Sequence, residues 1–128
     1  MKNVIISMQN RLLSEAIAGS LAESGLFRIE QILPGKTNDT LALCCALQAE
    51  ILFMEVSPLR DYSLERRLDL IEEVRQSVPD CKFALICDEN SHQELAQLVK
   101  RARQQQRIDA FFFTSVTPAY LTAALDAL

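Results

Sequence analysis

Short apolar runs recur along the chain and predict the strands of a sheet. A continuous apolar run is typical of a strand that is buried on both faces, as in a parallel sheet. One segment, residues 27–33, alternates apolar and polar side chains, so we expect a half-exposed strand at a sheet edge. The predicted strands are residues 3–8, 27–33, 50–56, 82–87 and 108–113.

The segments between these strands carry apolar residues at helical spacing, which predicts helices. Asn10 is expected to cap the first helix and Gly25 to end it. Ser91 and Glu94 form a capping-box pattern, and Thr117 before a proline is a strong helix start. The apolar positions that mark the helices, and that we expect on their buried faces, are Leu12, Leu13, Ala16, Ile17 and Leu21, then Leu41, Cys44, Cys45 and Leu47, then Leu64, Leu68, Ile71, Val74 and Val78, then Leu95, Leu98, Val99 and Ala102, and finally Leu121, Ala124, Leu125 and Leu128.

Strand and helix therefore alternate five times, with short connections. This order predicts a single α/β domain over residues 1–128, in which a parallel sheet carries helices on both faces. The chain stops inside a helical pattern at Leu128. A natural C-terminus and the boundary of a domain within a longer protein are both consistent with this pattern, and we slightly favour the domain boundary.

Composition and charge remove several classes of function. Three glycines leave no room for a glycine-rich phosphate loop, and a formal net charge of -4 argues against a polyanion-binding surface. The apolar runs are too short for a membrane helix, and the first residues do not form a signal peptide, so we expect a cytoplasmic protein with no membrane contact. The four cysteines form no C-x-x-C pair, and His92 is the only histidine. Metal-ligand spacing is therefore absent, and we expect reduced structural thiols and a surface histidine.

Four stretches resemble the response-regulator receiver domain of two-component signalling, in particular the N-terminal receiver of LuxR-type regulators. In that family an acidic residue opens strand three and an aspartate closes it, which corresponds here to Glu50 and Glu55. The resemblance implies a flavodoxin-like, doubly wound sheet of five parallel strands in the order 2-1-3-4-5. The matching stretches are AEILFME (49–55), VIISMQNRLLSEAI (4–17), FALICDE (83–89) and AFFFTSVTPAYLTAAL (110–125).

The resemblance also implies a particular chemistry. In receivers, the aspartate accepts a phosphoryl group from a histidine kinase, and Mg²⁺ held by an acidic pair neutralises the phosphoryl oxygens. A lysine pairs with the phosphate, while a strand-four hydroxyl and a strand-five aromatic residue carry the switch. This sequence departs at every one of these positions. The acidic pair corresponds to Met8 and Gln9, the phospho-acceptor to Glu55, the hydroxyl to Cys87, the aromatic residue to Phe111 and the lysine to Thr114.

These departures argue against the usual reaction. Mg²⁺ needs one or two carboxylates besides the phosphate, so Glu55 beside a thioether and an amide makes a poor site, and we expect no metal and no other cofactor. Loss of the acidic pair also removes the repulsion that the metal relieves, so the pocket can close without an ion. Glu55 is either a built-in mimic of the phosphorylated acceptor or, as we favour, a carboxylate satisfied by backbone N–H groups or Thr114. Cys87 is either a redox sensor or, as we favour, an inert thiol.

The sequence thus predicts an atypical receiver that is not an enzyme and that regulates transcription through partner binding or dimerisation. The expected contact surface is the fourth helix, fifth strand and fifth helix, or the first helix, with a histidine kinase as one candidate partner. DNA would be bound only by a domain outside this chain. We expect a solvated face rather than a patch for a nucleic acid or an acidic partner at the basic cluster of Lys100, Arg101, Arg103 and Arg107. The alternatives are an unconventional phospho-accepting receiver and a small-molecule or cofactor binder on a flavodoxin-like scaffold.

Overall fold

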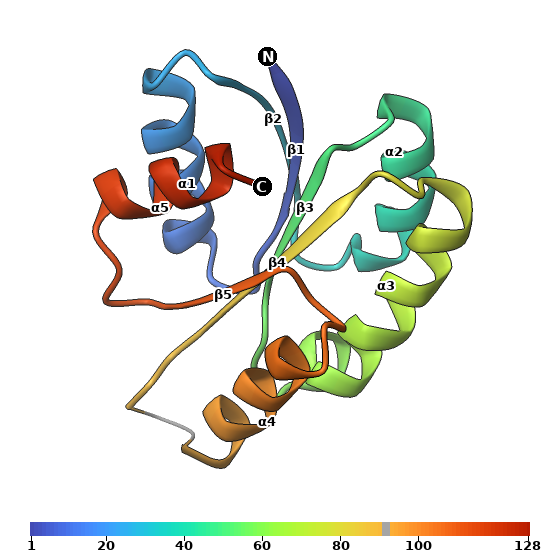
Figure 1. Cartoon of the computed structure of the whole chain (residues 1–128), viewed down its shortest axis with the longest axis vertical. Coiled ribbons are helices and arrows are strands. Elements are labelled where there is room, and N and C mark those ends of the chain that lie inside the picture. The colour runs from blue at the N-terminus through green and yellow to red at the C-terminus, as the bar shows by residue number, and fades with distance from the viewer. Residues whose placement is uncertain (91–92) are drawn as a thin grey trace.

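The computed structural model describes residues 1–90 and 93–128 and forms one parallel sheet (Figure 1). All strand pairs are parallel, and the order across the sheet is β2-β1-β3-β4-β5. Both the flavodoxin-like fold class and the strand order predicted from the sequence are confirmed. The strands are β1 (Lys2–Ser7), β2 (Phe27–Ile32), β3 (Ile51–Glu55), β4 (Lys82–Cys87) and β5 (Ala110–Phe113).

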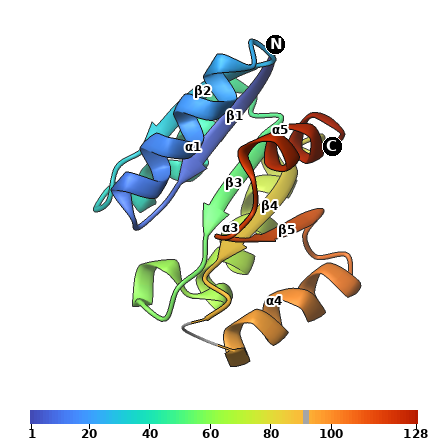
Figure 2. The same ribbon diagram turned by 90° about the vertical axis from the view of Figure 1, so that its left-hand side faces the viewer.

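Helices cover both faces of the sheet. α1 and α5 lie on one face, and α2, α3 and α4 lie on the other (Figures 1 and 2). Each face buries its own apolar core, because side chains of the central strands point alternately to the two sides. The helices are α1 (Arg11–Glu23), α2 (Thr40–Leu47), α3 (Leu64–Ser77), α4 (Gln93–Gln104) and α5 (Pro118–Asp126), with 3₁₀ turns at η1 (Thr37–Asp39) and η2 (Arg60–Tyr62).

Local signals in the sequence set the helix ends as predicted. The Asn10 side chain accepts a hydrogen bond from the Leu13 N–H at 3.0 Å and so caps α1. Gly25 follows this helix with a φ of 75°, which is a conformation that favours glycine. The Thr117 side chain accepts from the Tyr120 N–H and caps α5. The proposed capping residue Ser91 and the surface residue His92 lie outside the described residues.

Three apolar side chains predicted to face the core are exposed instead. Leu12 is 79% exposed and Ala16 is also exposed, because α1 buries the neighbouring stripe of its surface. That stripe includes Ser14, whose hydroxyl is satisfied by Gln31 Oε1 at 2.8 Å and can therefore be buried. Leu98 is 47% exposed, since α4 buries Val99 and Ala102.

The connections at the centre of the sheet determine where a site can form. From β1 the chain passes to α1 on one face, whereas from the adjacent β3 it passes to α3 on the other face (Figure 2). Folds of this kind bind ligands at that switch point, outside the carboxyl ends of the strands. Glu55 is the last residue of β3 and therefore lies at this edge. Among the described residues, no helix is both long and apolar enough to cross a membrane.

Candidate functional site

The carboxylate of Glu55 is bound by backbone rather than by other side chains. Its Oε1 accepts hydrogen bonds from the N–H groups of Gln9 at 2.8 Å and Asn10 at 2.9 Å. Both donors lie in the loop between β1 and α1, just before the N-terminus of α1, where the helix dipole favours a negative charge. Glu55 thus ties the end of β3 to the loop that follows β1. This is the satisfied carboxylate favoured from the sequence, with backbone N–H groups as its partners.

Arg67 on α3 lies beneath the same edge and is almost fully buried, with 1% of its surface exposed. Its Nε donates to the backbone oxygen of Glu55, Nη1 to Ser7 Oγ and Nη2 to the backbone oxygen of Ser7, all at 3.0 Å. The guanidinium carbon also lies 4.8 Å from the centre of the Tyr62 ring, which is cation–π geometry. One side chain therefore binds the last carbonyls of two adjacent strands.

The charge of Arg67 is costly to bury, and its surroundings offset that cost. Burial lowers the pKa of the guanidinium to about 10, while Tyr62, Glu55 and Asp61 act in the opposite direction, so the group stays charged at neutral pH. No carboxylate in the described part of the chain forms an ion pair with it. Its stabilisation comes from oxygen acceptors and the aromatic face, each a partner for a weakly hydrated guanidinium.

We call Ser7, Glu55, Tyr62, Arg67 and the Gln9–Asn10 backbone the β1–β3 clamp. Glu55 closes the switch point through the loop after β1, and Arg67 closes it from the α3 side. The sequence analysis did not identify Arg67 or Ser7. A signal was present, because Arg67 falls on the apolar stripe of α3 and Ser7 is a polar residue at the end of a buried run.

The two positions that correspond to the acidic pair of receivers supply no side-chain ligand. Met8 is 1% exposed and packs into the core on the α1 side, whereas the Gln9 side chain is exposed and only its backbone N–H reaches Glu55. Among the described residues, no group of three His, Cys, Asp or Glu side chains can hold a metal ion. Neither of these two positions therefore offers a carboxylate oxygen beside Glu55, which is the protein ligand that Mg²⁺ prefers.

The remaining predicted site residues lie at the ends of β4 and β5. Cys87 is 1% exposed, and burial, followed by the nearby Asp88 and Glu89, raises the pKa of its thiol to about 11. Its backbone oxygen accepts from the Thr114 N–H at 3.1 Å. The Thr114 side chain is exposed, and no side-chain hydrogen bond in the described part of the chain joins it to Glu55. Phe111 is half-buried and packs edge-to-face against Phe113, with the two ring centres 5.7 Å apart.

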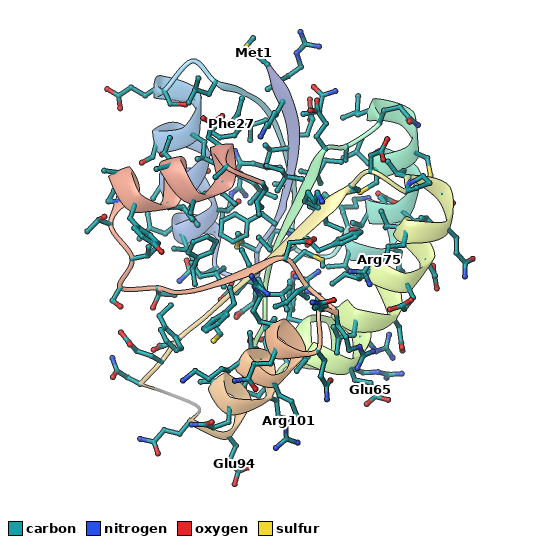
Figure 3. All side chains as sticks on the ribbon, in the orientation of Figure 1. Met1, Phe27, Glu65, Arg75, Glu94 and Arg101 are labelled. Carbon is teal, nitrogen blue, oxygen red and sulfur yellow. The ribbon has the colours of Figure 1, made fainter. Side chains whose placement is uncertain are left out.

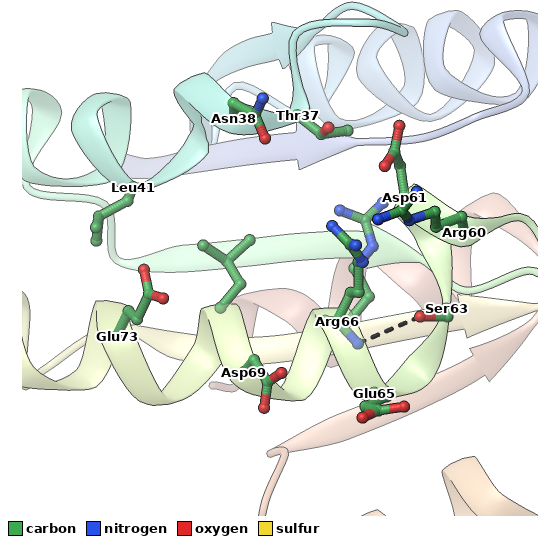
Figure 4. Close-up of a pocket in the computed structure, with 12 residues that line it drawn as sticks. Thr37, Asn38, Leu41, Arg60, Asp61, Ser63, Glu65, Arg66, Asp69 and Glu73 are labelled. Carbon is green, nitrogen blue, oxygen red and sulfur yellow. Dashed lines mark hydrogen bonds between the residues drawn. The ribbon is translucent and has the colours of Figure 1, made fainter.

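An open groove lies beside the clamp, between η1 and the start of α3 (Figure 4). It has a volume of about 690 Å³, and Arg67 contributes to its lining. Three arginines and four carboxylates line it, so neither sign of charge dominates by number. The groove therefore has no marked preference for a phosphate or for a cation. Its charged residues are Arg60, Asp61, Glu65, Arg66, Arg67, Asp69 and Glu73.

Comparison with solved structures agrees with this architecture. The chain is similar to a CheY-like protein (tadZ) from Pseudomonas aeruginosa, with 17% identity, a TM-score of 0.71 and coverage of 99% of this chain and 92% of that one. It is also similar to the REC domain of the response regulator AraT from Geobacillus stearothermophilus, with 18% identity, a TM-score of 0.71 and coverage of 98% of this chain and 93% of that one. A third similar structure is the Vibrio cholerae chemotaxis protein CheY4, with 12% identity, a TM-score of 0.74 and coverage of 99% of this chain and 98% of that one.

No protein-family model matches the sequence, and no curated protein is significantly similar to it. The structural similarity shows that the chain has the receiver-domain fold of two-component response regulators. At these low identities it does not carry over the role of any residue.

The clamp predicts that Arg67 contributes to stability far more than its sequence neighbour. Arg67→Met leaves the oxygens of Ser7 and Glu55 without a donor, and it should lower the free energy of unfolding by about 2–3 kcal/mol. Arg66→Met is the matched control, because Arg66 is exposed, and it should change the stability by less than about 0.5 kcal/mol. Urea unfolding followed by circular dichroism measures both, and equal stability of the two variants would contradict the clamp.

The environment of Cys87 predicts an unreactive thiol. Alkylation requires the thiolate, and both burial and the raised pKa of Cys87 disfavour it in the native protein at pH 8. Iodoacetamide should therefore modify the partly exposed Cys45 first and reach Cys87 only when denaturant is added. Peptide mass spectrometry over time gives the order. If native Cys87 were modified as fast as Cys45, its thiol would be reactive, and the result would favour the interpretation of Cys87 as a redox sensor.

Proposed function

We propose that this chain is an atypical receiver domain that works without Mg²⁺-dependent phosphorylation. The observation that carries the proposal is the bonding of Glu55, which occupies the position of the phospho-acceptor. Its Oε1 is held by the N–H groups of Gln9 and Asn10, in the loop where receivers place their metal ligands. Through these two hydrogen bonds the carboxylate holds the end of β3 against the loop that follows β1.

The chemistry of phosphoryl transfer supports a function that does not depend on Mg²⁺-dependent phosphorylation. Transfer depends on positioning and on cations that neutralise the charge of the phosphoryl oxygens. Met8 is a buried thioether, and Thr114 stands where receivers carry a lysine. The buried cation at this edge is Arg67, and its N–H groups are directed to Ser7 and to the backbone of Glu55. The guanidinium of Arg67 is therefore engaged with these oxygens rather than with the carboxylate of Glu55.

Glu55 and Arg67 already join the ends of β1 and β3 without a ligand. We therefore expect partners to act on the surface of the domain rather than on this site. We infer that the chain is a signalling and interaction module of a cytoplasmic transcription regulator, with no enzymatic activity of its own and no cofactor. Contacts would involve α4, β5 and α5, or α1, where Tyr120 and Leu12 are exposed. A histidine kinase is a candidate partner, and DNA would be bound by a separate domain.

One observation favours a second candidate function. Within the described part of the chain, Glu55 Oε2 accepts no hydrogen bond, and the side chain is only partly buried. This oxygen is available as a nucleophile, so an unconventional phospho-accepting receiver is the alternative. The two functions differ in whether a covalent bond forms between this oxygen and phosphorus.

Intact mass spectrometry distinguishes the two functions. The protein is incubated with acetyl phosphate or phosphoramidate and Mg²⁺, in parallel with Glu55→Gln and with a receiver that has an aspartate acceptor. The expected result is a phosphoryl adduct on the control receiver and none on this protein, because no metal or lysine neutralises the phosphoryl oxygens. An adduct that forms on the native chain and is absent from Glu55→Gln would establish the alternative.

A further inference from the structure

The surface formed by α3 and α4 combines an apolar groove with rims of opposite charge. The groove has a volume of about 310 Å³, and its apolar lining consists of Leu64, Leu68, Leu98 and Ala102. Glu65 and Asp69 line it from the α3 side, whereas Arg101 and Arg107 line it from the α4 side. Figure 3 shows Glu65 and Arg101 on the same part of the molecule. We call this the α3–α4 surface.

The charges of this surface are not paired within the chain. The ion pairs among the described residues join Arg11 to Glu15 and Arg75 to Glu72, and neither crosses the groove. Among the described residues, the four charges that line the groove therefore form no ion pair within the chain.

The apolar part of the surface is also incompletely covered. Leu98 remains 47% exposed, although the sequence pattern of α4 places it among core positions. It lies in the groove together with Leu64 and Leu68 of the neighbouring helix. An apolar centre with a polar, charged rim is the usual construction of a protein–protein interface.

The arrangement of charge identifies which partner fits. In an interface with twofold symmetry, each copy presents the same patch, so an acidic side must meet a basic side twice. The α3–α4 surface has both sides, and a twofold axis through the groove sets α3 of each copy against α4 of the other. We propose that two copies of this chain associate through the α3–α4 surface.

Other partners fit this surface less well. A nucleic acid or an acidic protein would meet the cations of α4, but Glu65 and Asp69 flank the same groove and would repel it. A second copy of the chain satisfies both rims at once. The proposal shares α4 with the contacts named under the proposed function but combines it with α3 instead of β5 and α5, and it holds whether or not Glu55 accepts a phosphoryl group.

The expected association is weak and depends on salt, because exposed ion pairs are screened and contribute little individually. Sedimentation velocity over a range of protein concentrations should show a monomer–dimer equilibrium that shifts toward monomer as salt is added. Leu98→Ser should weaken it as well, since the apolar centre is lost.

Charge exchange tests the proposed pairing directly. Asp69→Arg alone and Arg101→Asp alone should each raise the dissociation constant by about tenfold or more, because each places like charges together twice in the dimer. Mixing the two variants should restore association, since the mixed dimer pairs opposite charges at both contacts. Circular dichroism verifies that both variants are folded. Glu73→Arg and Arg103→Asp are matched controls on the same helices, do not line the groove and should associate like the native chain.

Three results would overturn the proposal. The first is a native chain that stays monomeric at every concentration in low salt. The second is a dimer that tolerates both single reversals. The third is a mixture of the two folded variants that does not associate, which would mean that Asp69 and Arg101 do not face each other between copies.

Discussion

The buried guanidinium of Arg67 is the constraint on which this structure depends. A charge in the interior is tolerated only where its donors are matched by acceptors, and here the acceptors are Ser7 Oγ and the last carbonyls of β1 and β3. Those carbonyls belong to the last residues of the two strands, so Arg67 joins the ends of β1 and β3. The first turn of α3 and the Tyr62 ring are held in place by the same interaction. Glu55 completes the closure by binding the loop that leads into α1.

The hydrogen bonds of Arg67 and Glu55 give a single physical reason why this chain differs from receivers at several positions of one sheet edge. In receivers the corresponding edge is open, with carboxylates that repel one another until a metal binds. Here Met8 is packed into the core, Gln9 offers its backbone, and the remaining carboxylate has its donors inside the protein. Under the proposed function, such a site needs no ion to be stable and regulation acts through surfaces. The charge and apolar patterns of the helices then become the informative features.

The apolar runs of the sequence were sufficient to predict a parallel sheet with helices on both faces, because such a sheet buries its central strands on both sides, whereas the strand order came from the resemblance to receivers. Asn10 and Thr117 were predictable as caps, since capping is a local interaction. Arg67 was not predicted, because a charged residue is assigned to the surface unless its distant partners are known. Leu12 was wrongly placed in the core because periodicity alone does not identify the buried stripe. The partners of Glu55 are backbone N–H groups, which have no signature in the sequence.

The most direct test of the closed site is nuclear magnetic resonance of the Gln9 and Asn10 amides. If their N–H groups are bonded to Glu55, both amide resonances should move in Glu55→Ala, where the acceptor is lost, and exchange faster with solvent. In the native protein they should stay unchanged as Mg²⁺ is raised through the millimolar range, with or without acetyl phosphate. A saturable shift of these two amides with Mg²⁺ would show that the metal competes for the carboxylate, and it would contradict the account of a site closed by the protein itself.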